Sequence, residues 1–454
     1  MTPDARSIAS EATAPIVIAG GTVVTMNDAR DVVQADVLIG ADGAIAALLP
    51  AGAPVPAGAR VIDAAGCLVT PGLVQAHLHL CQTLFRGLSE ERQLLAWLRE
   101  RIWPLEAAHD AVSLRASARL GIAELLLSGT TALLDMGTVH HTEQLFLAAE
   151  ESGIRYTGGQ ALMDRGQGVP PDLMQPTDAA LAESDALFTR WDGAAGGRLR
   201  YAYAPRFILS CSAALMEAVA ERARRGARVH THASEQEEEL EVVRAEIGRG
   251  DLEYLAEIGL TGPWLVLAHC VWLTEAGIDE VARSGTHVTH CPASNLKLAS
   301  GLAPVRALLD RGINVALGAD GAACSNRIDG WRQLWLAALV ASARDGAGTL
   351  HAREAFEIAT LGGARALGLA DQIGSVEVGK RADLLVVDAR PHLPNGDVYT
   401  TLVYSCRGAD VRTVLVDGRV VVEDGRLLSL DLEAVRQDAV AARDALLGRA
   451  GLAV

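Results

Sequence analysis

Four histidines and one aspartate stand at the ends of short apolar runs and could bind a metal ion together. His77 and His79 close GLVQAHLHL, His232 follows in ARVHTHASE, His269 in WLVLAHC and Asp320 in NVALGAD. Imidazole nitrogens and carboxylate oxygens are common ligands of divalent first-row metals. Because His77 and His79 are two residues apart, their side chains on a strand would point to the same face and could reach one ion. The pattern predicts a metal-dependent hydrolase.

These residues are far apart in the chain, and a barrel of parallel strands would bring them together. Each run is rich in branched apolar residues, which is typical of a buried parallel strand. We predict eight strands, at residues 72–79, 130–137, 155–162, 199–205, 227–233, 264–270, 286–292 and 314–320. With helical patterns between them, they indicate an α/β fold with a (β/α)8 TIM barrel, whose strand ends meet at one face. A doubly wound sheet is the alternative, but no Gly-rich fingerprint follows the first strand.

The two ends of the chain are rich in short β patterns and flank the barrel segment. Residues 16–68 alternate apolar runs with Gly pairs and Asp-Gly steps, which are hairpin signals. The same sequence pattern occurs again in GSVEVGKRADLLVVDA and RTVLVDGRVVVEDGRLL. We predict that residues 1–68 and 373–430 form one small β-sandwich domain and that residues 69–372 form the barrel. Residues 431–454 are expected to hold a C-terminal amphipathic helix.

A long segment follows the first barrel strand and carries two tryptophans. It reads LFRGLSEERQLLAWLRERIWPLEA and includes Trp97 and Trp103. We expect it to fold over the barrel mouth as a lid, where Trp97 would contact the substrate. The alternative is that both tryptophans are ordinary core residues of a packed helix.

Composition narrows the class of partner. The chain has 454 residues, a net charge of −16 and no basic cluster, which argues against nucleic acid or an anionic membrane as partner. No apolar stretch is long enough to span a bilayer, and the N-terminus lacks the layout of a secretory signal. Seven cysteines without CxxC pairs indicate reduced thiols and a cytoplasmic protein. We expect a small-molecule substrate, and the Ala-rich surface helices are compatible with a homo-oligomer.

Five motifs occur in a characteristic order along the chain: PGLVQAHLH, HTHASE, LAHCVWL, HCPASNLKLASG and LGADGAACSN. Together they resemble the amidohydrolase superfamily, in its branch of aromatic-amine deaminases, and the likeness runs over nearly the whole chain. That branch includes guanine deaminases, methylthioadenosine/S-adenosylhomocysteine deaminases and triazine hydrolases. The resemblance implies that the metal ligands are His77, His79, His232 and Asp320. It further implies that Glu235 and His269 are catalytic groups beside the metal.

The lysine content bears on the number of metal ions that the resemblance implies. Two-metal amidohydrolases of the cyclic-imide type use a carboxylated lysine on a strand between the HxH pair and the later histidines. The chain has only Lys297 and Lys380, and both come after His269. We therefore predict one divalent ion, with zinc as the first choice and iron as the alternative for the same ligands.

A hydrolytic deamination would use these groups in a definite way. A metal ion lowers the pKa of bound water, which can then attack the ring carbon that carries the exocyclic amine. Glu235 is expected to protonate the ring nitrogen, Asp320 to pass the water's proton to the departing ammonia, and His269 to orient the water. The alternative for Glu235 is a structural acid in SEQEEELE, where carboxylates favour a helix N-terminus.

Two polar residues bear on the substrate. Gln82 follows His79 by three residues, and Arg206 ends the fourth predicted strand. Both resemble residues that hold the purine in guanine deaminases, and an arginine fork can donate to a ring carbonyl and an adjacent nitrogen. We therefore favour a guanine-like purine. A salt-bridged or surface role is the alternative for Arg206.

Two departures keep other substrates open. GADGAACSN is more like the nucleoside and triazine members of the branch than like guanine deaminases. Ala96 stands where many relatives carry a glutamate, which in methylthioadenosine-type deaminases contacts the ribose hydroxyls. The alternatives are therefore an adenosine-type deaminase or an s-triazine hydrolase.

Some residues and one further class stay open at this point. His230 lies earlier in its strand than His232, which favours a packing or ligand-supporting role. The roles of His140, His141 and His290 are undecided between loop contacts and the site. A non-catalytic binding protein on the same barrel is the alternative of another class, although none of the expected ligands is missing.

Overall fold

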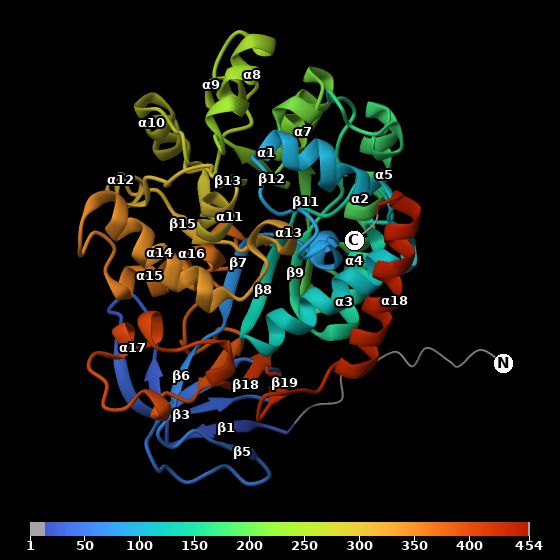
Figure 1. The fold of residues 1–454 in the computed structure, drawn as a ribbon. Coiled ribbons are helices and arrows are strands. Elements are labelled where there is room, and N and C mark those ends of the chain that lie inside the picture. Colours follow the sequence, from blue (N-terminus) through green and yellow to red (C-terminus); the bar gives the residue numbers. More distant parts are fainter. Residues whose placement is uncertain (1–13, 453–454) are drawn as a thin grey trace, which may run out of the picture.

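The computed structural model describes residues 14–452, and its centre is a closed barrel of eight parallel strands (Figure 1). These strands are β7 (Leu73–His79), β8 (Thr130–Asp135), β9 (Arg155–Gly158), β11 (Leu199–Pro205), β12 (Arg228–Ala233), β13 (Leu265–His269), β14 (His287–His290) and β15 (Val315–Leu317). Pairing of β15 with β7 and of β9 with β11 closes the ring. Each of the eight predicted segments contains one of these strands, and the predicted fold class is confirmed.

Two short strands extend the rim at the carboxyl ends of the barrel. β10 (Ala161–Leu162) pairs with β11, and β16 (Asp320–Gly321) pairs with β7. The predicted strand at 314–320 is therefore divided into β15 and β16. At the break, a Cβ on Gly318 would lie 2.8 Å from the carbonyl oxygen of His77, so only glycine allows this close approach.

Helices surround the barrel and connect its strands. The longer ones are α3 (Ala111–Leu127), α4 (Glu143–Ser152), α5 (Thr177–Trp191), α7 (Ala213–Arg224), α8 (Glu237–Ile247), α10 (Glu275–Ser284) and α14 (Gly330–Asp345). Local sequence sets their ends. The Thr274 side chain accepts the backbone N–H of Gly277 at the start of α10, and Gly285 ends that helix in a left-handed conformation, φ 74°.

Apolar side chains fill the barrel interior below the site. Val74, Ala132, Ala202, Val266 and Ala316 come from five of the strands and form one buried cluster. Residues that follow α16 (Leu361–Ala366) pack into the same cluster and cover the base of the barrel. The barrel is therefore a packed core that is open only toward the carboxyl ends of its strands.

As predicted, the two chain ends build one small β domain beside the barrel, and its strands form a single curled sheet. It contains β1 (Ile16–Ala19), β2 (Thr22–Val24), β3 (Val32–Ile39), β4 (Ile45–Pro50), β5 (Arg60–Asp63), β6 (Leu68–Pro71), β17 (Leu384–Val387), β18 (Val411–Val416), β19 (Arg419–Glu423) and β20 (Arg426–Leu427). The two halves meet where β6 pairs antiparallel with β17. Ile18, Val37, Leu384 and Leu415 belong to the core that both halves share.

A buried ion pair ties this small sheet to the barrel. The Arg155 guanidinium, on β9, donates to both carboxylate oxygens of Asp383, at 3.0 and 2.9 Å. It also contacts Asp417 at 3.2 Å. Arg155 and Asp383 are each 2% exposed, so water competes little with this contact.

The chain ends in α18 (Leu432–Ala450), which packs against α3. Asp431 begins the helix by accepting the backbone N–H groups of Glu433 and Ala434. Within residues 14–452, every helix is too short or too polar to cross a lipid bilayer.

Candidate active site

The four histidines and the aspartate that end the apolar runs converge at the carboxyl ends of the barrel strands. His77 and His79 end β7, His232 lies near the end of β12, His269 ends β13 and Asp320 begins β16. The backbones of His269 and Asp320 are left-handed, with φ of 72° and 60°. Non-glycine residues rarely adopt this conformation, and its strain is concentrated at functional sites.

Four ligand atoms face one point in space. The Nε2 atoms of His77 and His79 lie 3.3 and 3.4 Å from Asp320 Oδ1, and His79 Nε2 lies 3.2 Å from His232 Nε2. Ligands at about 2.0–2.1 Å from a tetrahedral ion are separated from one another by about 3.3–3.4 Å. His77 Nε2 is fully buried and faces Asp320 Oδ1. The donor set therefore fits one divalent ion in both spacing and chemistry.

Neighbouring groups orient two of these imidazoles. His232 Nδ1 donates to the backbone carbonyl of Arg206 at 2.6 Å, which leaves the lone pair of Nε2 facing the other ligands. His77 Nδ1 lies 2.8 Å from His230 Nε2. His230 thus supports His77 from below, in line with the packing or supporting role that its position in the strand indicates.

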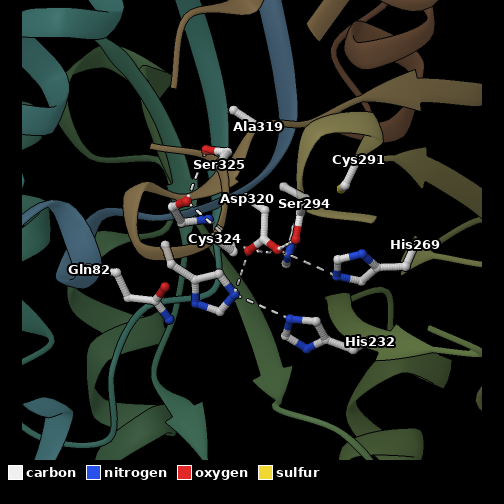
Figure 2. Close-up of polar contacts among 12 residues, drawn as sticks. Gln82, His232, His269, Cys291, Ser294, Ala319, Asp320, Cys324 and Ser325 are labelled. Atoms are coloured by element: carbon white, nitrogen blue, oxygen red, sulfur yellow. Dashed lines mark hydrogen bonds and ion pairs between the residues drawn. The ribbon is translucent and has the colours of Figure 1, made fainter. Parts of the chain in front are cut away.

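Two consecutive residues of α11 (Pro292–Lys297) hold the other two groups. The Ser294 hydroxyl donates to Asp320 Oδ2 at 2.7 Å, and the Asn295 amide lies 2.8 Å from His269 Nδ1. Both side chains are almost fully buried. Figure 2 shows Asp320 at the centre, with Ser294 beside it and His232 and His269 directed toward it.

Glu235 completes the cluster from the loop after β12. Its Oε2 lies 3.5 Å from His269 Nε2, and its Oε1 accepts the Ser300 hydroxyl at 3.5 Å. Glu235 is 4% exposed. Because it precedes α8 and its side chain reaches the cavity, it is not merely one more acid of the helix start.

Burial and neighbouring charge move the pKa values of the two carboxyl groups in opposite directions. Burial and the negative charge of Asp320 raise the pKa of Glu235 well above its ordinary value. Burial also raises the pKa of Asp320. The hydrogen bond with His77 and the electrostatic influence of His77 and His79 outweigh burial and hold this pKa well below the ordinary value. A raised pKa suits Glu235 to donate a proton, and a lowered pKa suits Asp320 to bind a cation.

A narrow cavity of about 20 Å³ lies directly above this cluster. Its floor includes His79, His232, Glu235, His269 and Asp320. Its walls and roof include Leu94, Trp97, Leu98, Phe207 and Leu298. The cavity is thus polar at one end and apolar at the other.

The segment after β7 covers this cavity, in agreement with the expected lid. It forms η1 (Leu80–Phe85), α1 (Leu94–Trp97), the π-helical η2 (Leu98–Ile102) and α2 (Trp103–Ala107). Trp97 lines the cavity, whereas Trp103 is buried and does not line it. Ala96 is exposed and does not line it.

Glu106 is a buried site residue that the sequence analysis missed. Arg206 forms an ion pair with it, and the Gln82 amide donates to its Oε1 at 3.0 Å. Gln82 and Arg206 both line the cavity, but Glu106 occupies part of their hydrogen-bonding capacity. The signal available in the sequence was weak, because Glu106 is one of several acids in the lid segment.

The remaining histidines lie outside the cavity. His290 is buried, and neither of its ring nitrogens has a hydrogen-bond partner among the described residues. His140 Nε2 lies 2.8 Å from the carbonyl oxygen of Asp172. None of His140, His141 and His290 lines the cavity.

Residues 68–421 match the family model described as "Amidohydrolase family". A 5'-deoxyadenosine deaminase of Methanosarcina acetivorans is 39% identical over 96% of the chain and 99% of the relative. A 5-methylthioadenosine/S-adenosylhomocysteine deaminase of Halobacterium salinarum is 41% identical over 96% of the chain and 98% of the relative.

Solved structures agree with these relatives. An adenosine deaminase from Xanthomonas campestris with bound zinc has a TM-score of 0.89 and 32% identity, over 96% of this chain and 99% of that one. The Escherichia coli guanine deaminase has a TM-score of 0.81 and 29% identity, over 90% of this chain and 98% of that one.

Proposed function

The chain belongs to the amidohydrolase family and is a hydrolase of carbon–nitrogen bonds, and on this premise we propose that it deaminates an adenosine-type nucleoside. The nucleoside would be modified or deoxygenated at its 5' position, and the reaction would release ammonia. The observation that carries the proposal is the position of the Glu235 carboxyl, 3.5 Å from His269 and on the same cavity floor as Asp320 and the histidine cluster, under an apolar roof. This hydrolase assignment sets aside the non-catalytic alternative.

The adenosine-type substrate is preferred over the guanine-like purine that the sequence favoured. The relatives with 39% and 41% identity are named for adenine nucleosides, whereas the guanine deaminase is 29% identical. Arg206 was expected to read an oxo group on the ring, but its charge is neutralised by Glu106. Position 96 offers the ribose hydroxyls no hydrogen-bond partner, because Ala96 stands where some relatives carry a glutamate.

A single divalent ion fits the four converging ligand atoms. We propose that His77, His79, His232 and Asp320 hold it, with zinc as first choice because a similar structure contains zinc. A divalent ion held there would lower the pKa of a water molecule toward neutrality and so supply a nucleophile at working pH. The neutral state of the imidazoles suits this role, because burial lowers the pKa of His79 and His232 well below the ordinary value.

The chain's own residues account for the proton movements. Glu235 begins protonated and donates its proton to the ring nitrogen beside the carbon under attack. Asp320 Oδ2, which Ser294 orients, accepts the proton of the attacking water and delivers it to the leaving amine. His269 Nε2 lies 3.5 Å from Glu235 and 3.8 Å from Asp320, so it can accept a hydrogen bond from the water between them. As ammonia leaves, the hydroxyl on that carbon returns its proton to Glu235, so that water and the amine are converted into a ring oxo group and ammonia.

The test is ammonia release across a substrate panel, with the metal content of the same sample measured. The panel contains 5'-deoxyadenosine, methylthioadenosine, S-adenosylhomocysteine, adenosine, guanine, 8-oxoguanine and an amino-s-triazine. We expect kcat/KM to be highest for the adenine nucleosides. Higher kcat/KM for guanine or for the triazine would contradict the adenosine-type proposal and leave the hydrolytic chemistry intact.

A further inference from the structure

A second cleft lies at the amino-terminal rim of the barrel, at the end opposite the candidate active site. It has a volume of about 620 Å³ and shares no lining residue with the active-site cavity. Its outer wall comes from α5 and α7, through Phe188 and Arg222. Its inner wall comes from the first residues of the barrel strands, including Thr157, Arg200 and Arg228.

Four arginines line this cleft, and two of them lack a carboxylate partner. Arg222 donates to both oxygens of Asp185, at 2.7 and 2.5 Å, and Arg225 forms an ion pair with Glu221. Among residues 14–452, neither Arg200 nor Arg228 forms an ion pair with any carboxylate. Arg228 donates instead to the backbone carbonyl of Ala366 at 2.5 Å.

A buried hydroxyl lies next to these two cations. Thr157 is 1% exposed, and its Oγ1 has no hydrogen-bond partner within the described part of the chain. Thr157 is paired in register with Arg200 across β9 and β11, so both side chains leave the same face of the sheet. A buried hydroxyl without a partner costs free energy, which a ligand oxygen in the cleft would recover.

The two unpaired arginines also repel each other. Burial, together with the charge of Arg200, lowers the pKa of Arg228 to about 10. Asp192 lines the cleft as well, but its Oδ1 accepts the backbone N–H of Tyr201. The inner wall therefore carries two cations whose charge no carboxylate within contact balances.

We propose that this cleft binds a phosphate group, with Arg200, Arg228 and Thr157 donating hydrogen bonds to its oxygens. The guanidinium fork matches the spacing of phosphate oxygens and forms charge-assisted hydrogen bonds that are stronger than neutral ones. The ligand is inorganic phosphate or a phosphate monoester, and the cleft has room for the second. The site is separate from the proposed deamination and does not depend on it.

The experiment measures phosphate binding to the metal-loaded full chain by calorimetry, at constant ionic strength balanced with sodium chloride. We expect saturable binding of inorganic phosphate and a rise in Tm that chloride does not produce. Arg200→Gln and Thr157→Val are expected to weaken phosphate binding at least tenfold. Tighter binding of ribose 5-phosphate than of inorganic phosphate would identify a monoester as the preferred form.

Controls separate this site from the metal site. Arg283→Gln, on exposed α10, should bind phosphate as the parent protein does. Ammonia release by Arg200→Gln and Thr157→Val should be unchanged, because both residues lie outside the active-site cavity. The proposal is overturned if phosphate acts no differently from chloride, or if both variants bind phosphate as tightly as the parent protein.

Discussion

Glu235 and Asp320 illustrate how position alone gives two carboxyl groups different tasks. Both are buried, so desolvation raises the pKa of each. For Asp320, the hydrogen bond with His77 and the electrostatic influence of His77 and His79 outweigh burial, and the net result is a pKa well below the ordinary value. Glu235 has only the Ser300 hydroxyl and the distant charge of Arg206 to oppose its burial, and its pKa is raised well above the ordinary value.

Replacement of the Glu235 carboxyl by an amide tests this division of roles. Glu235→Gln keeps the shape of the side chain but cannot donate an acidic proton to the ring. We expect kcat to fall by about 10³-fold, within the range for general acid catalysis, while the bound metal stays stoichiometric. Metal analysis and ammonia release on the same preparation check both parts. A variant with near-normal kcat would show that Glu235 is not the proton donor.

Ser294 is expected to position Asp320 without touching the substrate. Ser294→Ala removes the hydroxyl that lies 2.7 Å from Asp320 Oδ2. We expect kcat to fall about tenfold to a hundredfold, as for other groups that orient metal ligands, with KM little changed. Ser294→Thr, which retains the hydroxyl, should recover part of the lost kcat. A change confined to KM would contradict a positioning role.

The residue types explain what the sequence could reveal at this scale. Histidines and an aspartate at strand ends are recognisable as metal-binding groups from their residue type alone. His77 and Asp320 were therefore predicted from their type and their place in the chain. Glu106, Ser294 and Asn295 act through hydrogen bonds to groups far along the chain. No local pattern marks those contacts, because they arise only when the lid and α11 pack against the barrel.

At the scale of elements, β16 depends on a close contact with η1. A Cβ on Gly321 would lie 2.0 Å from Gln82 Oε1. Gly321→Ala should therefore displace Gln82 and raise KM for the substrate more than it lowers kcat. Steady-state ammonia release measures this split. Gly448→Ala is the matched control, because nothing lies within 4 Å of its Cβ, and it should leave both constants unchanged.

The strands were predictable because buried parallel strands are short runs of branched apolar residues, such as LVLAH in β13. The division of the last run into β15 and β16 was not predictable. It results from the packing of Gly318 against the backbone of His77, a contact between distant parts of the chain. The π-helical turn in the lid likewise has no signature in a sequence pattern that reads as an ordinary helix.

At the scale of the whole molecule, the Arg155–Asp383 pair should contribute strongly to stability. Arg155→Met leaves Asp383 buried without its cation, and loss of one partner of a buried pair costs about 3–5 kcal/mol. We expect a matching decrease in the free energy of unfolding, measured by urea denaturation. Arg412→Met, which breaks the exposed pair with Asp424, should cost less than about 1 kcal/mol. Equal effects of the two variants would contradict this contribution.

Acid should destabilise the fold through buried neutral histidines away from the metal site. Burial lowers the pKa of His109 to about 4 from the ordinary value of 6.5. Between these values the unfolded chain binds more protons than the folded one, so stability should fall as pH decreases from 6.5 to about 4.

His109→Gln should make the pH dependence of unfolding shallower in this window, and denaturation at several pH values measures the slope. His351→Gln is the control, because His351 is exposed. An unchanged slope in the His109 variant would show that this imidazole does not titrate as its burial requires.

The pairing of β6 with β17 has a consequence for how the protein is made. During translation, β6 leaves the ribosome early, and the strand that covers its edge emerges only after the entire barrel has been synthesised. Until then the nascent chain exposes the unpaired backbone and the apolar side chains of an incomplete sheet, which invites aggregation. Circular permutants that join the two termini and open the chain elsewhere would shorten this interval. Their yield of soluble protein, compared with that of the parent chain, would measure how much protein is lost to aggregation.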